Sequence, residues 1–232
     1  ITLLTSLPND AAAIPAFARK YRVSCNLCHN PFPALTAFGE QFAGNGFRMA
    51  IDEEPKDTIA TGDDLLTLPA SVPLALRLDA YAQLYADGKA ATDFQLPFNL
   101  KLLSGGTLGK KLSYYVYFLL AERGEVAGIE DAFIYWNDIA DAPVDLAVGQ
   151  FQVSDPMFKR ELRLEVLDYA IYKVLVGLQP ANLTYDRGLM ASADLAGFTI
   201  TGTLVNGDGI PAANELFRYD NDANKNLFGH IT

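Results

Sequence analysis

The sequence predicts an α+β fold, in which a small α-helical segment near the amino terminus precedes an antiparallel β meander. Two observations carry this prediction: apolar side chains recur at helical spacing from residue 14 to about residue 50, and they alternate with polar ones from Leu74 onward. The acidic, proline-containing stretch between these two regions is typical of a linker. We therefore divide the chain into a signal-like segment at 1–13, a helical domain at 14–51, a linker at 52–72 and a β domain at 73–232.

The composition of the 232 residues suits a folded chain with an acidic surface. Half of the residues are hydrophobic and 20% are charged, which is enough for a sizeable buried core. The formal net charge is -10, so nucleic acid is not an expected partner, because phosphate binding needs a basic patch. This charge favours basic partners or cations. No apolar run reaches the roughly 18 residues that a membrane-spanning helix needs.

The amino-terminal segment Ile1–Ala13 looks like the end of a secretory signal. A short apolar stretch precedes the small residues Ala11, Ala12 and Ala13, which fit a cleavage pattern. The alternative is an ordinary extension of the domain. The first interpretation predicts an exported protein of the outer membrane, the periplasm or the extracellular space.

Within the helical domain, apolar spacing predicts a helix that follows a five-residue cysteine motif. Leu35, Phe38 and Phe42 repeat at intervals of three and four residues, which places them on one helix face. Gly44 and Gly46 are expected to end this helix.

The β domain is predicted from strict alternation and from turn-forming residues between the alternating runs. In 74–84, leucine and alanine share one face, and charged, tyrosine and glutamine side chains share the other. Regularly spaced strands of this kind form a meander that closes as a barrel or packs as a sandwich. The stretch 155–170 breaks the pattern, and we expect a short helix or a long lateral loop there. Further strands are predicted at about 94–102, 111–121, 130–137, 144–153, 182–195 and 198–206, and from Asn226.

The motif Cys25-Asn26-Leu27-Cys28-His29 carries the chemistry of this chain. Two thiols three positions apart can add to the two vinyl groups of one porphyrin, and the adjacent histidine then reaches the iron. The alternatives are a chance pentapeptide, a redox CxxC or a zinc site. Zinc would need two more Cys or His ligands, and only His230 remains. We therefore predict one covalently bound haem c, with its iron on His29.

The second axial ligand of this iron is open to several residues. Met49, Met157, Met190 and His230 carry suitable atoms. Met49 is the preferred ligand, because it lies just past the helix that follows the motif and can return over the ring. An apolar role for Met49 at the domain edge, and an iron that is open or water-bound, are the alternatives.

Aromatic side chains surround the motif, and we expect some of them to contact the cofactor. Crowded aromatic rings exclude water and tune the reduction potential. The same rings are also what a small helical core needs, and the two interpretations coincide if the core is the haem pocket. The predicted contact residues are Phe32, Phe38 and Phe42, with Phe17 and Phe47 nearby.

One further pattern gives a weaker prediction than the cysteine motif. The stretch from Asp220 to Asn224 places side-chain oxygens at alternate positions, like the start of a calcium loop, but it lacks the downstream glycine and glutamate. A polar hairpin turn is the favoured interpretation. The sequence contains no recognisable catalytic Ser/His/Asp set, phosphate loop or HExxH motif, so we do not expect an enzyme.

The segment Ile14–Met49 resembles the haem module of secreted bacterial monohaem cytochromes. The shared features are P-A-F-A-R, then C-x-x-C-H, then F-P-x-L-x-x-F-G and a closing N-G-F. It is similar to the amino-terminal part of the fused cytochrome–porins of iron-oxidising bacteria. More loosely, 146–158 and 185–197 resemble porin strand pairs. About 160 residues follow the linker, enough for about eight or nine strands rather than about sixteen, so we expect a truncated piece, a smaller barrel or a sandwich.

This resemblance implies single-electron transfer at the outer membrane or cell surface, with Cys25, Cys28 and His29 as the haem residues and a porin-like barrel or partial barrel as the β domain. The implied partners are redox proteins or an extracellular electron donor or acceptor, outer-membrane lipid, and other subunits of an oligomer or larger complex. The alternative is a soluble periplasmic or extracellular cytochrome subunit of a larger assembly. An enzyme or sensor with an open haem site is a third hypothesis. Apolar side chains on both faces of 111–121 favour the membrane.

Overall fold

The fold was analysed in a computed structural model. The segment 1–13 lies outside the residues that the structure describes, and so do the predicted helix or loop at 155–170 and Met157. The described residues are 15–50, 53–55, 58–63, 66–84, 92–153, 173–176, 179–207, 209–210 and 212–232.

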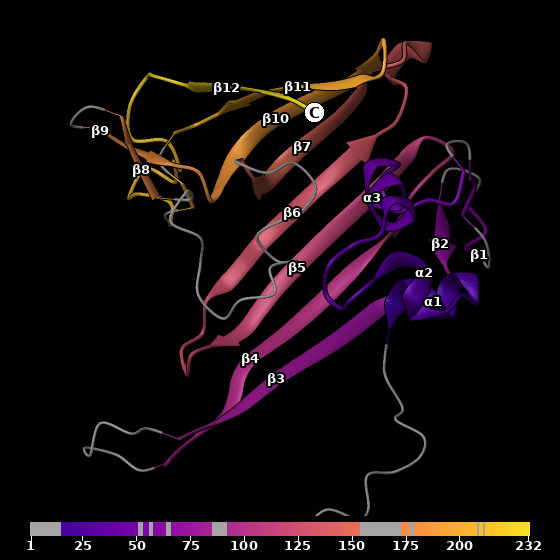
Figure 1. The fold of residues 1–232 in the computed structure, drawn as a ribbon. Helices are drawn as coiled ribbons and strands as arrows, with labels where there is room; N and C mark the ends of the chain where they lie inside the picture. Colours follow the sequence, from indigo (N-terminus) through magenta and orange to yellow (C-terminus); the bar gives the residue numbers. More distant parts are fainter. Residues whose placement is uncertain are drawn as a thin grey trace, which may run out of the picture.

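Three short helices precede a large antiparallel sheet (Figure 1). The helices are α1 (Ala16–Tyr21), α2 (Cys25–Cys28) and α3 (Ala37–Gly44). A small hairpin of β1 (Thr58–Ala60) and β2 (Thr67–Pro69) follows, within the range predicted as a linker. The large sheet contains β3 (Leu74–Leu84), β4 (Thr92–Thr107), β5 (Leu112–Glu122), β6 (Gly128–Trp136), β7 (Asp145–Gln152), β10 (Tyr185–Leu195), β11 (Phe198–Val205) and β12 (Asn226–Ile231).

Two smaller elements complete the described chain. The 3-10 helix η1 (Ile139–Asp141) connects β6 to β7, and β8 (Lys173–Val176) pairs with β9 (Gln179–Asn182) in a separate hairpin. The strand order of the large sheet is β12-β11-β10-β7-β6-β5-β4-β3, and every neighbouring pair is antiparallel. The predicted positions of these eight strands are confirmed to within a few residues at most ends.

The two faces of the sheet differ in burial, as β5 illustrates. Its odd-numbered side chains from Ser113 to Leu119 are buried, whereas its even-numbered ones are half-buried. Through the strand pairing, Tyr115 lies opposite Phe133 on β6 and opposite Gly105 on β4. We call the face that carries Tyr115 the inner face, and the other the outer face.

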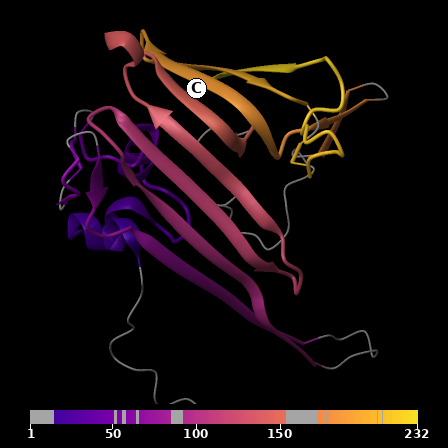
Figure 2. The ribbon, with the colours of Figure 1, turned by 180° about the vertical axis from the view of Figure 1, so that it is seen from behind.

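The outer face is apolar across the sheet. One row of paired residues, from Ile134 through Val148, Leu189 and Leu204 to Leu227, crosses five strands, and each of these side chains is at least 43% exposed. Figure 2 shows the sheet from behind, with the helices gathered beside one end of the long strands. Exposed apolar side chains in such number mark an interaction surface, from which water is excluded when a partner covers it.

The predicted α+β class, with a small helical haem domain and a porin-like barrel, partial barrel or sandwich, is wrong. The described chain is mostly β, and its helices of six, four and eight residues are too short to enclose a core of their own. The large sheet is a single open sheet, because in the described part of the chain β3 and β12 are each paired on one side only. Alternation specifies the two faces of a strand, but it does not specify whether the first and last strands meet.

The helices share one hydrophobic cluster with the inner face of the sheet. Phe47 stacks on Tyr115, with ring centroids 4.5 Å apart and an interplanar angle of 15°. On its other side Phe47 stacks on Phe17 of α1 at 5.1 Å. Arg48, which is fully buried, donates to the backbone oxygens of Gly109 and Lys110 in the β4–β5 turn. These contacts fix the helical segment against the sheet.

Candidate functional site

The cysteine motif forms a single helical turn with a defined start. Ser24 caps α2, since its hydroxyl oxygen accepts a hydrogen bond from the backbone N–H of Asn26. The backbone N–H of His29 donates to the carbonyl of Cys25 at 3.0 Å and closes the turn. Cys25 and Cys28 therefore lie on one turn of helix, and His29 follows directly.

A second helix holds this turn in place. Thr36 caps α3 through its Oγ1, which accepts from the N–H of Gly39, and the same hydroxyl donates to the carbonyl of Leu27 at 2.7 Å. The backbone N–H of Thr36 donates to the carbonyl of Cys28 at 2.8 Å. The start of α3 is therefore bonded directly to the motif.

The imidazole of His29 has one nitrogen fixed by the backbone. Its Nδ1 lies 2.9 Å from the carbonyl oxygen of Pro33, and a carbonyl can only accept, so Nδ1 carries the proton. In a neutral ring this leaves Nε2 with its lone pair, which is the form that binds a metal. The ring of Phe32 lies beside the imidazole, with centroids 4.9 Å apart. The His29 ring is thus held in both tautomer and orientation.

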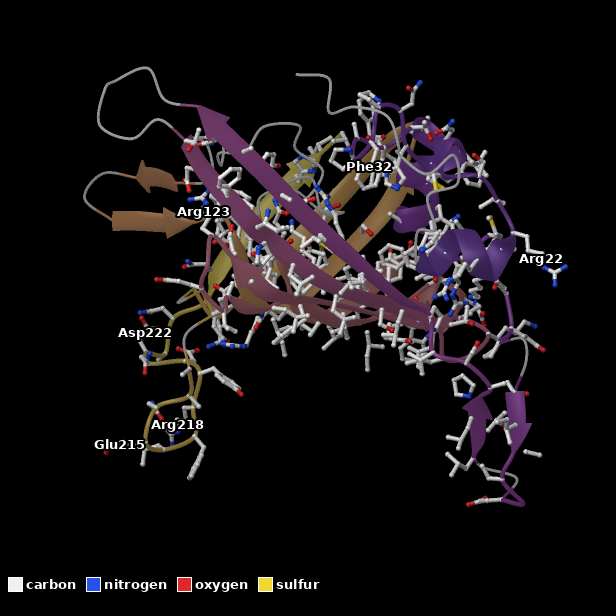
Figure 3. The ribbon with its side chains drawn as sticks, turned by 90° about the horizontal axis from the view of Figure 1, so that it is seen from below. Arg22, Phe32, Arg123, Glu215, Arg218 and Asp222 are labelled. Atoms are coloured by element: carbon white, nitrogen blue, oxygen red, sulfur yellow. The ribbon has the colours of Figure 1, made fainter. Side chains whose placement is uncertain are left out.

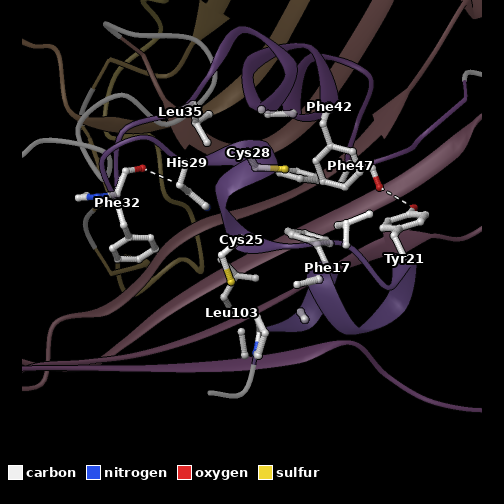
Figure 4. Close-up of a pocket in the computed structure, with 18 of the residues that line it drawn as sticks. Phe17, Tyr21, Cys25, Cys28, His29, Phe32, Leu35, Phe42, Phe47 and Leu103 are labelled. Carbon is white, nitrogen blue, oxygen red and sulfur yellow. Dashed lines mark hydrogen bonds between the residues drawn. The ribbon is translucent and has the colours of Figure 1, made fainter. Parts of the chain in front are cut away.

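Both thiols and His29 line one cavity of about 380 Å³ (Figure 4). The helical segment contributes aromatic walls through Phe17, Phe32, Phe42 and Phe47. The remaining wall comes from the inner face of the sheet, with Ala75, Leu76, Arg77, Lys101, Leu103, Tyr115 and Tyr117. The result is a largely apolar pocket, lined by the imidazole of His29 and by both cysteine thiols of the described chain.

Met49 lines the same cavity as His29 and is 39% exposed. Its backbone N–H donates to Glu53 Oε2 at 3.0 Å, and the Tyr21 hydroxyl lies 3.0 Å from both oxygens of the same carboxylate. Lys20 forms an ion pair with Glu53 at 3.2 Å. The buried Glu53 carboxylate therefore anchors the backbone of the candidate iron ligand.

Burial raises the pKa of two side chains in this region. The pKa of the Cys28 thiol is raised by desolvation and, to a lesser extent, by the neighbouring Cys25, which keeps the thiol protonated at neutral pH. The pKa of Tyr21 is raised strongly by desolvation and then by the negative charge of Glu53. Tyr21 is therefore a neutral hydrogen-bond donor to Glu53.

The structure brings together most of the residues that the sequence singled out. Cys25, Cys28, His29, Phe32, Phe42 and Met49 line the cavity. Phe38 is not among the residues that line it and is 37% exposed. Met190 is buried in the core cluster, and His230 lies on β12 opposite Thr201, so neither lines the cavity. Figure 3 places Asp222 on the loop with Glu215 and Arg218, at the other end of the sheet from Phe32.

Two parts of the site were not predicted from the sequence: the wall that the sheet contributes, and Glu53. Lys101 alternates with leucines in its strand, and this pattern predicts a polar side chain on one face without saying whether that face is buried. In the structure Lys101 is only 6% exposed. Arg77 lies directly opposite Lys101 in the β3–β4 pairing. One signal in the sequence could have indicated this wall: the polar residues of β3 and β4 lie on one face of each strand, and that face could be covered by another part of the chain.

These residues fit a haem better than a bare metal ion. In the described part of the chain, no group of three or more His, Cys, Asp or Glu side chains is placed to hold a metal ion. A haem iron needs only axial protein ligands, because the porphyrin nitrogens supply four others. Nearby thiols, one imidazole with a fixed tautomer and a thioether in an apolar cavity match that need.

Comparisons of the chain with protein-family models, with curated proteins and with solved structures give no match in any of the three. Among the described residues, no helix is long and apolar enough to cross a membrane.

Proposed function

We propose that this chain binds one haem c covalently and transfers single electrons. The observation that carries the proposal is the hydrogen bond between His29 Nδ1 and the carbonyl of Pro33 in a cavity that both thiols line. That bond leaves Nε2 for an iron, and a fixed second nitrogen is what metal-ligating histidines ordinarily have. The resemblance of Ile14–Met49 to monohaem cytochrome modules points in the same direction.

The chain's own residues have separate tasks. Cys25 and Cys28 would hold the haem: each would add its thiol S–H across one vinyl double bond, with the sulfur on one carbon and the hydrogen on the other. His29 would hold the iron through Nε2, and Met49 is the candidate for the second protein ligand. Haem supplies, when bound, an iron that changes between two oxidation states. Phe42, Phe47 and the sheet wall exclude water from the site.

Electron transfer is favoured over catalysis by the two axial candidates. If His29 and Met49, which both line the cavity, were the two protein ligands of an iron, no position would be left for a substrate. Thioether ligation also raises the reduction potential, which suits a carrier of electrons. The expected exchange partners are redox proteins or an extracellular donor or acceptor.

We place this activity at a membrane, in line with the outer-membrane location that the resemblance implies. The supporting observation is the apolar outer face, on which Ile134, Val148 and Leu189 are exposed side by side across three strands. The inner face instead carries charged and tyrosine side chains such as Lys101 and Tyr117. A sheet that is apolar on one face and polar on the other matches contact with acyl chains on the apolar side.

Peroxidase staining after denaturing gel electrophoresis tests the covalent haem. The wild-type chain should retain haem, and Cys25→Ala/Cys28→Ala should lose it. Ser24→Ala, a change next to the motif that leaves both thiols in place, is the matched control and should retain the stain. A wild-type haem that extracts into acidified organic solvent contradicts the proposal.

Cell fractionation tests the location. The haem-stained band should stay with the membranes after washing with high salt and should leave them only with detergent. Release by salt alone would support the soluble periplasmic or extracellular alternative.

A further inference from the structure

Three consecutive residues after α3 are each bonded to a different part of the chain. The carbonyl oxygen of Phe47 lies 3.1 Å from the hydroxyl of Tyr21 on α1, which can donate to it (Figure 4). The side chain of Arg48 donates to the backbone of the β4–β5 turn. The backbone N–H of Met49 donates to Glu53 Oε2 at 3.0 Å. The segment that carries the candidate iron ligand is therefore held by a helix, by the sheet and by the residues that follow it.

Glu53 connects the backbone of Met49 to helix α1. Its carboxylate is buried, forms the ion pair with Lys20 at 3.2 Å and lies 3.0 Å from the Tyr21 hydroxyl. The backbone N–H of Glu53 donates to the carbonyl of Ala50 at 3.2 Å, so its backbone and its side chain both close the turn that starts at Met49. A carboxylate fixed by several charge-assisted hydrogen bonds keeps one orientation, and the N–H of Met49 is held in that orientation.

The side chain of Met49, in contrast, has space around it. It is 39% exposed, and it lines a second cavity of about 520 Å³ as well as the cavity that contains His29 and both thiols. Tyr21 and Glu53 also line this second cavity. Methionine has three rotatable side-chain bonds, so packing does not fix its thioether here. A backbone that is already fixed lowers the conformational entropy that is lost when the thioether binds a metal.

We propose that Glu53 is a positioning residue, which keeps Met49 within reach of the iron, and that the Tyr21 hydroxyl supports it. This inference rests on the proposed function and deepens it, because it assigns the strength of the second iron ligand to a buried carboxylate that does not touch the iron. Glu53 acts through the backbone of Met49. Without its carboxylate, the thioether should leave the iron more readily and small ligands should take its place.

Titration of the intact ferric holoprotein with imidazole tests the inference, because imidazole competes with Met49 for the iron. Glu53→Leu removes both carboxylate oxygens at similar size. It should weaken the far-red band of methionine ligation and raise the affinity for imidazole about tenfold or more, since a hydrogen bond to a charged group contributes this much. Glu53→Gln keeps an acceptor oxygen for the Met49 N–H and should stay within about threefold of the wild-type affinity.

Two tyrosine substitutions provide a matched pair. The Tyr135 hydroxyl, like that of Tyr21, bonds to a backbone carbonyl and to a carboxylate, here Gly44 at 2.7 Å and Asp145 at 3.1 Å. Tyr135 is not among the residues that line the haem cavity. Tyr21→Phe should raise the affinity for imidazole by about threefold or more. Tyr135→Phe also loses a buried hydroxyl, but it should leave the imidazole affinity and the far-red band unchanged.

The outcomes separate positioning from a general loss of stability. Wild-type imidazole affinity in Glu53→Leu, or equal changes in Tyr21→Phe and Tyr135→Phe, overturns the inference. If Glu53→Leu does not fold, the two phenylalanine variants decide, and wild-type affinity in Tyr21→Phe overturns it. A wild type that carries covalent haem without the far-red band also overturns the positioning role and leaves the covalent haem in place. Absence of covalent haem from the wild type overturns the proposed function itself, so the two failures are distinguishable.

Discussion

Gly39 of α3 lies directly against the carbonyl group of Cys28: a Cβ added at Gly39 would come within 2.4 Å of that oxygen and 3.0 Å of a Leu35 methyl group. Backbone rather than a flexible side chain therefore limits the approach of the two helices. The motif and α3 can be this close only because residue 39 has no side chain.

Gly39→Ala should destabilise the chain and lower haem incorporation. The added methyl group must push α2 away from α3, at a cost of about 1–3 kcal/mol. Gly44→Ala in the same helix is the control, since a Cβ there has no neighbour within 4 Å. Alanine at 44 should be neutral or stabilise the fold by up to about 1 kcal/mol. Urea unfolding measures both, and equal effects of the two substitutions would show that the close approach has no energetic role.

Met49→Ala should change the axial ligation of the iron. A methionine-ligated ferric haem has a weak charge-transfer band in the far red, and we expect this band in the wild type and its loss in the variant. Met190→Leu is the control, because Met190 is buried in the core and outside the cavity, and a swap of similar volume costs less than about 1.5 kcal/mol. If the band persists in Met49→Ala, another residue is the ligand.

The contribution of Asp145 to the free energy of unfolding should fall as pH rises. Burial is the main cause that raises the pKa of Asp145, and Asp138 and Asp194 add to it, against the hydrogen bonds from the Asp138 N–H and the Tyr135 hydroxyl. A folded-state pKa above the unfolded value of about 3.9 favours the fold fully below that pH, and the contribution disappears as pH rises through the folded pKa. The free energy of unfolding of the wild type, relative to Asp145→Asn, should therefore decrease upward from about pH 4.

The pH series needs a second substitution to exclude a general effect of removing one negative charge. Asp222→Asn changes an exposed carboxylate on the loop before β12. Urea midpoints for the wild type and both variants, measured from pH 3 to pH 7, provide the comparison. A wild-type difference from Asp145→Asn that is constant over this range, or that has the opposite sign, is incompatible with the raised pKa.

Val148→Asp and Leu189→Asp should each weaken binding to lipid. These two residues are paired on β7 and β10, and their side chains are 44% and 43% exposed on the outer face. A carboxylate in hydrocarbon costs about 2–4 kcal/mol, so flotation with phosphatidylcholine vesicles should fall by about tenfold or more. Leu216→Asp adds the same charge at an exposed loop position and should float like the wild type. Equal flotation of all four proteins would remove the outer face as a lipid contact.

The strands were predictable because their signal is local. Alternation in 74–84 and 111–121 is a property of neighbouring residues, and β3 and β5 occupy nearly those positions. The helical segment was predicted as a domain of its own, and this was wrong because the partner of its aromatic residues lies far along the chain. Phe47 was expected near the haem motif, and its ring stacks on Tyr115 of β5, a contact that no local pattern encodes.

The cysteine motif specified the reactive atoms of the site but not its walls. Spacing alone brings Cys25, Cys28 and His29 together, since one helical turn suffices. Lys101 could not be assigned from the sequence, because alternation gives two faces and does not say which of them is covered. The pairing of Arg77 with Lys101 depends on the β3–β4 register, which is set by the hairpin as a whole.

The rings of Phe17, Phe47 and Tyr115 form one continuous stack from α1 to the middle of the sheet. A local opening of β5 therefore removes one wall of the cavity, so amide hydrogen exchange in β5 and access of small solutes to the cavity must rise and fall together. The short helices carry the thiols and the imidazole, but the lifetime of the closed site depends on contacts between residues that lie far apart in the sequence.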